Sequence, residues 1–271
     1  KLFSYKYNNS VISGTDAVLN ACMSLYDLGA SQNDYIILPA LCFIATANAI
    51  RAAGFQPLFC DIKLDTLNLD ETKVEDLIDS VKSHQAKVVA IIAVSTMGKP
   101  CKMDILKYVA DRHTMTLICD NAEGHGCQYE RKWMGHWADI STYSFFAAHL
   151  ICAAEGGMIS TNNEKLANII HSTRTHGREN GKAYFNHVRF GLNSKMNDLE
   201  AALGLAQVSH KVFWQTWNTR KKNYQYLVDN IAAFNMNKAY FSLEDEDEVI
   251  CPHGFSVVVK DSSKFKELTQ A

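Results

Sequence analysis

The stretch Val88-Val89-Ala90-Ile91-Ile92-Ala93 is an unbroken apolar run, too short for a typical buried helix. Such a run predicts a strand with both faces covered, as in a parallel sheet that lies between helices. Three further stretches fit strands of the same kind: 35–39, 56–60 and 116–119, the last ending at Asp120. The stretch at 88–93 therefore predicts a strand of an α/β sheet that is covered on both faces.

Helical segments alternate with these strands along the chain. We predict helices over Asp16–Leu28, Ile44–Ala53, Glu71–Val81, Met103–His113, Lys165–Thr173 and Met196–Leu227. Two later segments, 140–145 and 157–160, are predicted strands. This alternation is typical of a mostly parallel sheet with helices on both faces.

The composition changes near residue 230. Glu244–Glu248 is acidic, and Phe255–Val259 resembles a new strand. We predict a large domain over residues 1–230 and the start of a smaller C-terminal domain over 231–271, cut short. Because the chain begins at Lys1 and stops within a plausible helix, we expect it to be a piece of a longer protein.

Charge and cysteine content exclude several classes of function. The net charge of −2 argues against binding to nucleic acid or to an anionic membrane surface. The eight cysteines form no C-x-x-C pair and most lie in apolar runs, which favours reduced thiols in a cytoplasmic protein and no metal site. No apolar run approaches the roughly 20 residues of a membrane span.

Short motifs follow several of the predicted strands, where α/β folds place their ligands. Ser13-Gly14-Thr15 opens a helix, so it is either a helix cap or a phosphate site. Asp120 ends a strand and is either a functional acid or a cap. Ser144 precedes His149 in the loop after another strand, and Glu155-Gly156-Gly157 is a turn. Each motif alone has a sufficient structural explanation.

Taken together and in order, five stretches resemble one family. They are Leu38–Ile50, Asp61–Leu69, Gly98–Asp104, Asp139–Phe145 and Gly191–Ala202. The chain is identified on these stretches as similar to the DegT-type sugar aminotransferases of nucleotide-sugar biosynthesis. That resemblance implies the fold type I architecture of enzymes dependent on pyridoxal phosphate, with a large cofactor-binding domain and a small C-terminal one.

The resemblance also implies which residues hold the cofactor. Gly14 and Thr15, together with Ser144, would hold its phosphate, and Phe43 would stack on its pyridine ring. Asp120 would pair with the ring nitrogen, because a carboxylate keeps that nitrogen protonated and the ring electron-withdrawing.

Two other positions carry expectations from the resemblance. Glu123 stands where the family usually has glutamine, so its contact with the cofactor is in doubt. Asn193, before the longest predicted helix, would reach the phosphate bound by a neighbouring subunit. The resemblance thus implies a homodimer with shared sites.

His149 stands where the family's lysine bonds covalently to the cofactor. An imidazole cannot form that bond stably, but its ordinary pKa near neutrality suits a general base and acid. The chain has histidine in place of lysine, and a short stretch later it has Glu-Gly-Gly. In both features it is similar to the GDP-4-keto-6-deoxymannose 3-dehydratases. This implies bound pyridoxamine phosphate, a nucleotide-linked 4-keto-6-deoxy sugar as substrate, and glutamate as amino donor.

Two other functions compete with the dehydratase. The wider family implies a nucleotide-sugar aminotransferase, which would need another lysine or a half-reaction without one. A noncatalytic homologue that binds a sugar nucleotide or pairs with an active subunit is the third. The retained Asp120, Ser144 and Gly14-Thr15 argue against a decayed site, whereas Leu150 and Ala153-Ala154 depart from the family's pattern.

Overall fold

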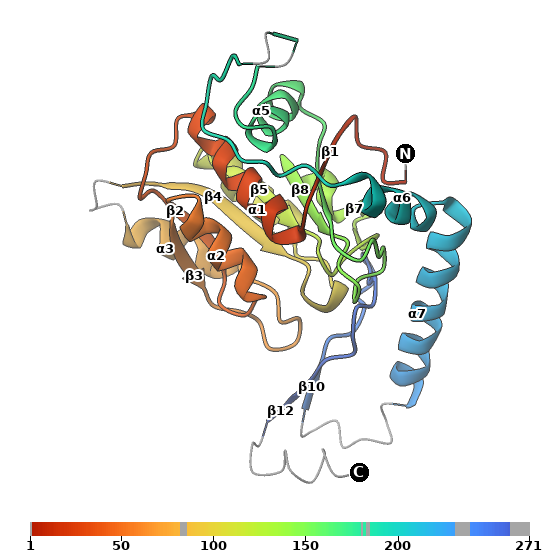
Figure 1. Cartoon of the computed structure of the whole chain (residues 1–271). Helices are drawn as coiled ribbons and strands as arrows, with labels where there is room; N and C mark the ends of the chain where they lie inside the picture. Colours follow the sequence, from red (N-terminus) through yellow and green to blue (C-terminus); the bar gives the residue numbers. More distant parts are fainter. Residues whose placement is uncertain (1, 82–85, 180, 183–184, 231–238, 261–271) are drawn as a thin grey trace.

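The computed structural model describes residues 2–81, 86–179, 181–182, 185–230 and 239–260. Seven strands form the central sheet in the order β1-β9-β8-β5-β4-β2-β3 (Figure 1). Their bounds are Tyr7–Val11 (β1), Tyr35–Pro39 (β2), Gln56–Cys60 (β3), Val88–Val94 (β4), Thr116–Asp120 (β5), Ile140–Ser144 (β8) and Gly157–Thr161 (β9). Only β9 runs against the others in this sheet. The predicted α/β class with a mostly parallel sheet is confirmed.

Strand β4 shows why both faces of the sheet are covered. Ala90 and Ile92 point into one apolar cluster, and Ile91 and Ala93 point into the other. Side chains alternate between the two faces of a strand, so a run of apolar residues fits only a strand buried on both sides.

Helices form the two outer layers. On one face lie α1 (Gly14–Met23), α2 (Ile44–Ala52) and α5 (Glu164–Arg174), and on the other lie α3 (Val74–Ser80) and α4 (Met103–Arg112). Short 3₁₀ turns span Ser24–Leu28 (η1), Glu71–Lys73 (η2), Thr96–Gly98 (η3) and Met134–Trp137 (η4). Figure 1 shows α1 and α2 lying across the sheet, with α5 beyond α1. The predicted helix over Asp16–Leu28 thus continues as a 3₁₀ turn after Met23.

The prediction of one helix over Met196–Leu227 is wrong. The chain forms α6 (Asp198–Gln207) and then α7 (His210–Asn230), with a break at 208–209. The side chain of Asn197 caps α6 by accepting a hydrogen bond from the Glu200 amide, which fixes where that helix begins. The break contains neither glycine nor proline, so helical periodicity continues through it and hides it.

The strand β1 has the sequence Tyr-Asn-Asn-Ser-Val and was not predicted. Its polar side chains hide the strand pattern, and it forms only by pairing with β9 at the edge of the sheet. Small strands also escaped prediction: β6 (Gln128–Tyr129), β7 (Lys132–Trp133), β10 (Ala239–Phe241) and β11 (Glu248–Val249). The predicted strand 255–259 is shorter, as β12 (Val257–Val259).

The segment after residue 241 packs against the part of the chain that carries the central sheet. Strand β11 pairs with β6, and Lys99, which follows β4, forms a buried ion pair with Glu248. The amides of Cys251 and His253 donate to the carbonyls of Gly98 and Met97, at 3.0 Å and 3.2 Å. These contacts bring residues 250–254 beside the carboxyl ends of the sheet strands. Residues 231–238 and 261–271 lie outside the described part, so the domain boundary at 230 stays a prediction.

No helix in the described residues combines the length and the apolar character needed to cross a membrane.

Candidate functional site

Four strands bring the predicted site residues to one edge of the sheet. Strands β1, β2, β5 and β8 run in the same direction, so their carboxyl ends lie at the same edge. Gly14 and Phe43 follow β1 and β2, and Asp120 and Ser144 are the last residues of β5 and β8. This is the edge at which open α/β sheets bind ligands.

Asp120 is a buried carboxylate, 6% exposed. The hydroxyl of Thr46 donates to it at 3.0 Å, and the Ala122 amide and the Thr142 hydroxyl donate at 3.2 and 3.4 Å. Burial raises the pKa of Asp120, and these hydrogen bonds oppose that shift. Asp120 forms no ion pair with a basic side chain in the described part of the protein. No helix follows it directly, so the interpretation of Asp120 as a helix cap is wrong.

Phe43 immediately precedes α2, and its ring is 74% exposed. Thr46, which donates to Asp120, lies one helical turn further along. Residues three apart share a face at the start of a helix. The Phe43 ring is thus exposed at the start of the helix that holds Thr46 against Asp120, and its face is free to stack on a planar ligand.

The start of α1 packs tightly against the end of β8. A side chain on Gly14 would place its Cβ 2.5 Å from the Ser144 Cβ and 2.8 Å from the Ser144 Oγ. The Ser13 side chain accepts from the Asp16 amide at 3.1 Å, so the cap interpretation of Ser13-Gly14-Thr15 is confirmed. Among the described residues, the amides of Gly14 and Thr15 have no hydrogen-bond partner. A capped helix start with two free amides beside a serine suits a phosphate.

His149 lies in the loop after β8, and backbone hydrogen bonds hold the two ends of this loop together. The Phe145 amide donates to the Gly156 carbonyl, and the Ala153 amide donates to the Phe145 carbonyl, both at 2.8 Å. The half-buried His149 ring lies 5.9 Å from the ring of His125 and 5.2 Å from that of His253, measured between centroids.

The environment keeps the His149 imidazole neutral. Burial lowers its pKa to about 4, with further lowering from the charges of His253 and Arg220. Its buried Nδ1 has no hydrogen-bond partner in the described part of the chain. A neutral imidazole with a free ring nitrogen can accept a proton at neutral pH.

His125 is fully buried behind His149. The Ile151 amide donates to its Nδ1 at 3.3 Å, which assigns the neutral tautomer with the proton on Nε2. Burial lowers the pKa of His125 to about 3, and nearby His149, His253 and Arg220 add to the shift. Sequence reasoning missed this residue, although it lies five positions after Asp120 in the same loop.

Glu123 is bound to the protein's own backbone. Its Oε2 accepts from the Met97 amide at 2.6 Å, and Met97 has a left-handed conformation with φ of 54°. The His253 amide in turn donates to the Met97 carbonyl. Burial lowers the pKa of His253, whereas the charge of Glu123 opposes that effect. Glu123 therefore supports the loop beneath His253, and its predicted contact with a cofactor stays a prediction.

Asn193 is exposed, and none of its hydrogen bonds reaches another predicted site residue among the described ones. Its side-chain oxygen accepts a hydrogen bond from Lys195, and Asn193 forms a backbone bridge with Thr175. The next residue, Ser194, donates to the buried Asp16 of α1 at 3.0 Å. The segment is thus fixed against α1, while the role of Asn193 across a subunit interface stays a prediction.

Arg220 and His253 complete the surroundings of His149, and neither residue was predicted from the sequence. Arg220 comes from α7, and its guanidinium donates to the Ala148 carbonyl at 3.2 Å and to the Pro252 carbonyl at 3.4 Å. It thereby connects the His149 loop to the segment that carries His253. A single histidine between Pro252 and Gly254 has no motif that could have marked it.

The geometry fits a pyridine ring that carries a phosphate. Asp120 is a buried carboxylate with no basic partner among the described residues, so it could accept the proton of a ring nitrogen. Phe43, exposed at the start of α2, offers an aromatic face to a ligand, and the close approach of Gly14 to Ser144 brings the free amides at the start of α1 beside the Ser144 hydroxyl. The described residues contain no cluster of metal-binding side chains.

Comparisons with known proteins agree with this geometry. Residues 2–271 match the DegT/DnrJ/EryC1/StrS aminotransferase family. The chain is 36% identical to GDP-perosamine synthase from Caulobacter vibrioides over 186 residues, which cover 69% of this chain and 48% of that protein. It is 31% identical to the 3-oxo-glucose-6-phosphate:glutamate aminotransferase of Bacillus subtilis over 277 residues, covering 99% of this chain and 58% of that protein.

A solved structure gives a further comparison. The GDP-4-keto-6-deoxy-D-mannose-3-dehydratase of E. coli, with bound hydrated pyridoxal phosphate, superimposes with a TM-score of 0.85 at 25% identity. The match covers 99% of this chain and 72% of the dehydratase. The chain spans about half the length of the first curated relatives that it matches.

Proposed function

The chain belongs to the DegT/DnrJ/EryC1/StrS aminotransferase family, and we propose that it is a cofactor-dependent enzyme that removes the 3-hydroxyl of a nucleotide-linked 4-keto-6-deoxy sugar. The observation that carries this proposal is His149. Its imidazole stands at the position where the resemblance places a lysine, and burial keeps it in the neutral, proton-accepting form. A transferase of the usual kind needs an amine there that this chain does not supply.

Pyridoxamine phosphate, when bound, would supply an amine and an electron-withdrawing ring. Asp120 would hold a proton on the ring nitrogen, and the Phe43 ring would stack on the pyridine. The free amides of Gly14 and Thr15, with the Ser144 hydroxyl, would bind the phosphate. These contacts would together position a cofactor that has no covalent bond to the protein.

His149 would move the proton in the reaction. At neutral pH it is unprotonated, so it can take a proton from a carbon next to the reacting amine and return it to the leaving hydroxyl as water departs. Over the whole reaction, carbon 3 of the sugar exchanges its hydroxyl for a hydrogen, which is a two-electron reduction. The amino donor, which we propose is glutamate, provides the two electrons and becomes its 2-oxo acid with release of ammonia.

A nucleotide-sugar aminotransferase is the second candidate, because a curated relative at 36% identity is GDP-perosamine synthase. For this chain, that function requires an amine other than one at position 149. Some of the other lysines already have a structural partner. Lys99, for example, forms a buried ion pair with Glu248.

One experiment separates the candidate functions. The purified protein is supplied with pyridoxamine phosphate, glutamate and GDP-4-keto-6-deoxymannose, and the sugar is followed by mass spectrometry. A 3-deoxy-4-keto sugar as product supports the dehydratase. A 4-amino sugar that retains its 3-hydroxyl contradicts the dehydratase and supports the aminotransferase. An unchanged sugar, with a panel of other 4-keto sugars also unchanged, favours the noncatalytic homologue.

We also infer a homodimer with shared sites. Helix α6 exposes Leu199, Leu203 and Leu205 at 82%, 54% and 73%, and it directly follows the segment that carries Asn193. Exposed leucines on one helix are typical of a surface that another subunit covers. Analytical ultracentrifugation at micromolar concentration should show a dimer. A monomer with full activity would contradict shared sites.

A further inference from the structure

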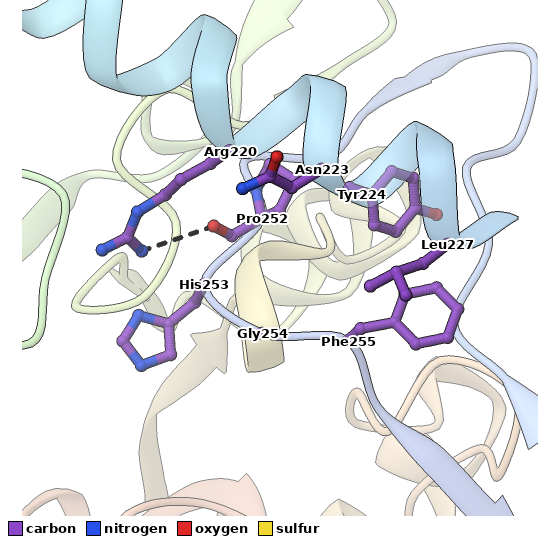
Figure 2. A pocket seen from close by; sticks show the side chains of 8 residues that line it. All are labelled: Arg220, Asn223, Tyr224, Leu227, Pro252, His253, Gly254 and Phe255. Atoms are coloured by element: carbon purple, nitrogen blue, oxygen red, sulfur yellow. Dashed lines mark hydrogen bonds between the residues drawn. The ribbon is translucent and has the colours of Figure 1, made fainter.

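A hollow of about 190 Å³ opens between α7 and residues 252–255, next to His149. Figure 2 shows its two unlike ends. The guanidinium of Arg220 and the ring of His253 lie together at one end, and the side chains of Leu227 and Phe255 lie at the other. Because a water molecule occupies roughly 30 Å³ of liquid, the hollow has room for a small organic ion.

Arg220 at the polar end has an uncompensated positive charge. Its hydrogen-bond partners are two neutral carbonyls, those of Ala148 and Pro252, and it forms no ion pair with an acidic side chain in the described part of the protein. The neighbouring Lys221, by contrast, is paired with Glu244. Two carbonyl bonds use only part of the five N–H donors of a guanidinium.

The groups around Arg220 are mostly basic. His149 and His253 lie 5.2 Å apart, His125 lies behind His149, and the charge of Arg220 lowers the pKa of all three. The nearest acid in this group is Glu123, which is bound to the Met97 amide. An anion at this end would therefore meet one fixed cation and little repulsion.

We propose that Arg220 and His253 bind a small oxyanion, a carboxylate or phosphate group of a substrate, at the polar end of this hollow. The planar guanidinium matches the two oxygens of such a group, and the apolar end accommodates the carbon chain or ring behind it. The proposal rests on the proposed function in one respect: it places the bound group beside His149, the reacting residue. Two sources fit this chemistry, namely the amino donor's carboxylate and the diphosphate of the sugar nucleotide.

Binding at this site changes the state of His149. An anion on Arg220 offsets the positive charge that disfavours protonation of the imidazole. The pKa of His149 should therefore rise when the anion binds. Arg220 would thus be a positioning residue that couples occupancy of the hollow to the proton affinity of His149.

The test uses two unreactive probes, glutarate for the carboxylate source and GDP for the diphosphate source. Each is titrated by calorimetry into protein preloaded with pyridoxamine phosphate, which fills the phosphate site beside Gly14. We expect one probe to bind at millimolar concentration or tighter, and Arg220→Gln to weaken it by roughly tenfold or more. Lys222→Gln is the matched control, since Lys222 is exposed on α7 about 200° around the helix from Arg220.

Nuclear magnetic resonance of labelled histidines gives the second readout. The bound probe should raise the pKa of His149 in the wild type and in Lys222→Gln, but not in Arg220→Gln. Arg220→Lys keeps the positive charge but loses the planar guanidinium, so we expect it to bind the probe with intermediate affinity. This variant replaces Arg220→Gln in the test if Arg220→Gln does not fold. Equal affinity in wild type and Arg220→Gln, an equal loss in Lys222→Gln, or no binding of either probe would overturn the proposal.

The binding experiments and the turnover experiment test the two proposals separately. The probes report on the hollow without any reaction, so an aminotransferase would give the same binding result as a dehydratase. Failure of the proposed function appears only in the mass of the sugar product. If a probe binds as expected but no sugar is converted, the proposed anion site is supported and the proposed dehydratase function is refuted.

Discussion

His125 should make the protein less stable as the pH falls from 7 to 5. Burial lowers its pKa to about 3, whereas the unfolded chain has the ordinary value of about 6.5. Between these values the unfolded state binds a proton and the folded state does not. The stability that His125 contributes is therefore present above about pH 6.5 and is lost as the pH falls towards the folded pKa.

The size of this effect depends little on the precise folded pKa. At pH 5 the neutral His125 of the folded protein contributes about 2 kcal/mol less stability than at pH 7, provided that its pKa lies below about 4. The variant His125→Asn removes the titration. Its side-chain oxygen can occupy the position of Nδ1, which accepts from the Ile151 amide at 3.3 Å.

Urea unfolding of both proteins at pH 7 and pH 5 measures the effect. The difference in unfolding free energy between the two pH values should be about 2 kcal/mol smaller in His125→Asn. Any constant destabilisation by the substitution cancels in this comparison, as do the other histidines that titrate equally in both proteins. Equal pH dependence in the two proteins would show that His125 is protonated in the fold, and the argument from burial would fail.

Four substitutions at three positions test the rest of the site. Asp120→Asn should keep the fold, judged by circular dichroism, and largely abolish turnover, because an amide cannot hold a proton on the ring nitrogen; full activity would refute that role. His149→Lys should let borohydride fix pyridoxal phosphate to the chain, which mass spectrometry detects, whereas fixation in the unmodified protein would favour the aminotransferase. His149→Asn should retain the cofactor but lower the rate by roughly 10² to 10⁴, measured as turnover. Gly14→Ala should cost about 1–3 kcal/mol in urea unfolding and weaken pyridoxamine phosphate in fluorescence titrations, because its Cβ would lie 2.5 Å from that of Ser144; unchanged affinity would remove Gly14 from the phosphate site.

Strands buried on both faces were the easiest elements to predict. The strand at 35–39 has the predicted bounds, and the one at 88–94 extends the prediction by a single residue. The edge strand at 56–60 also has the predicted bounds, although most of its residues are only partly buried. Continuous apolar sequence has one stable arrangement in an α/β fold, between two layers of helix. By contrast, β1 contains Asn8, Asn9 and Ser10, and its position depends on its partner β9, far along the chain.

Motif order was equally informative about the cofactor site. Phe43, Asp120 and Ser144 could be placed together because each follows a predicted strand or lies at its end, and parallel strands end at one edge. Gly14 joined them only through the resemblance, since the strand β1 that precedes it was not predicted. What the sequence left open was each residue's local role. Asp120 proved to be a carboxylate bound by Thr46 and Thr142, with no helix to cap.

The sequence by itself determined the α/β class, the edge of the sheet where the site lies, and the histidine at position 149. Those features follow from periodicity and from the identity of single residues, which are local properties of the chain. Only the tertiary structure decided the electrostatics around His149. His125, Arg220 and His253 come from three separate segments, and burial and charge depend on distances through space that no local pattern encodes.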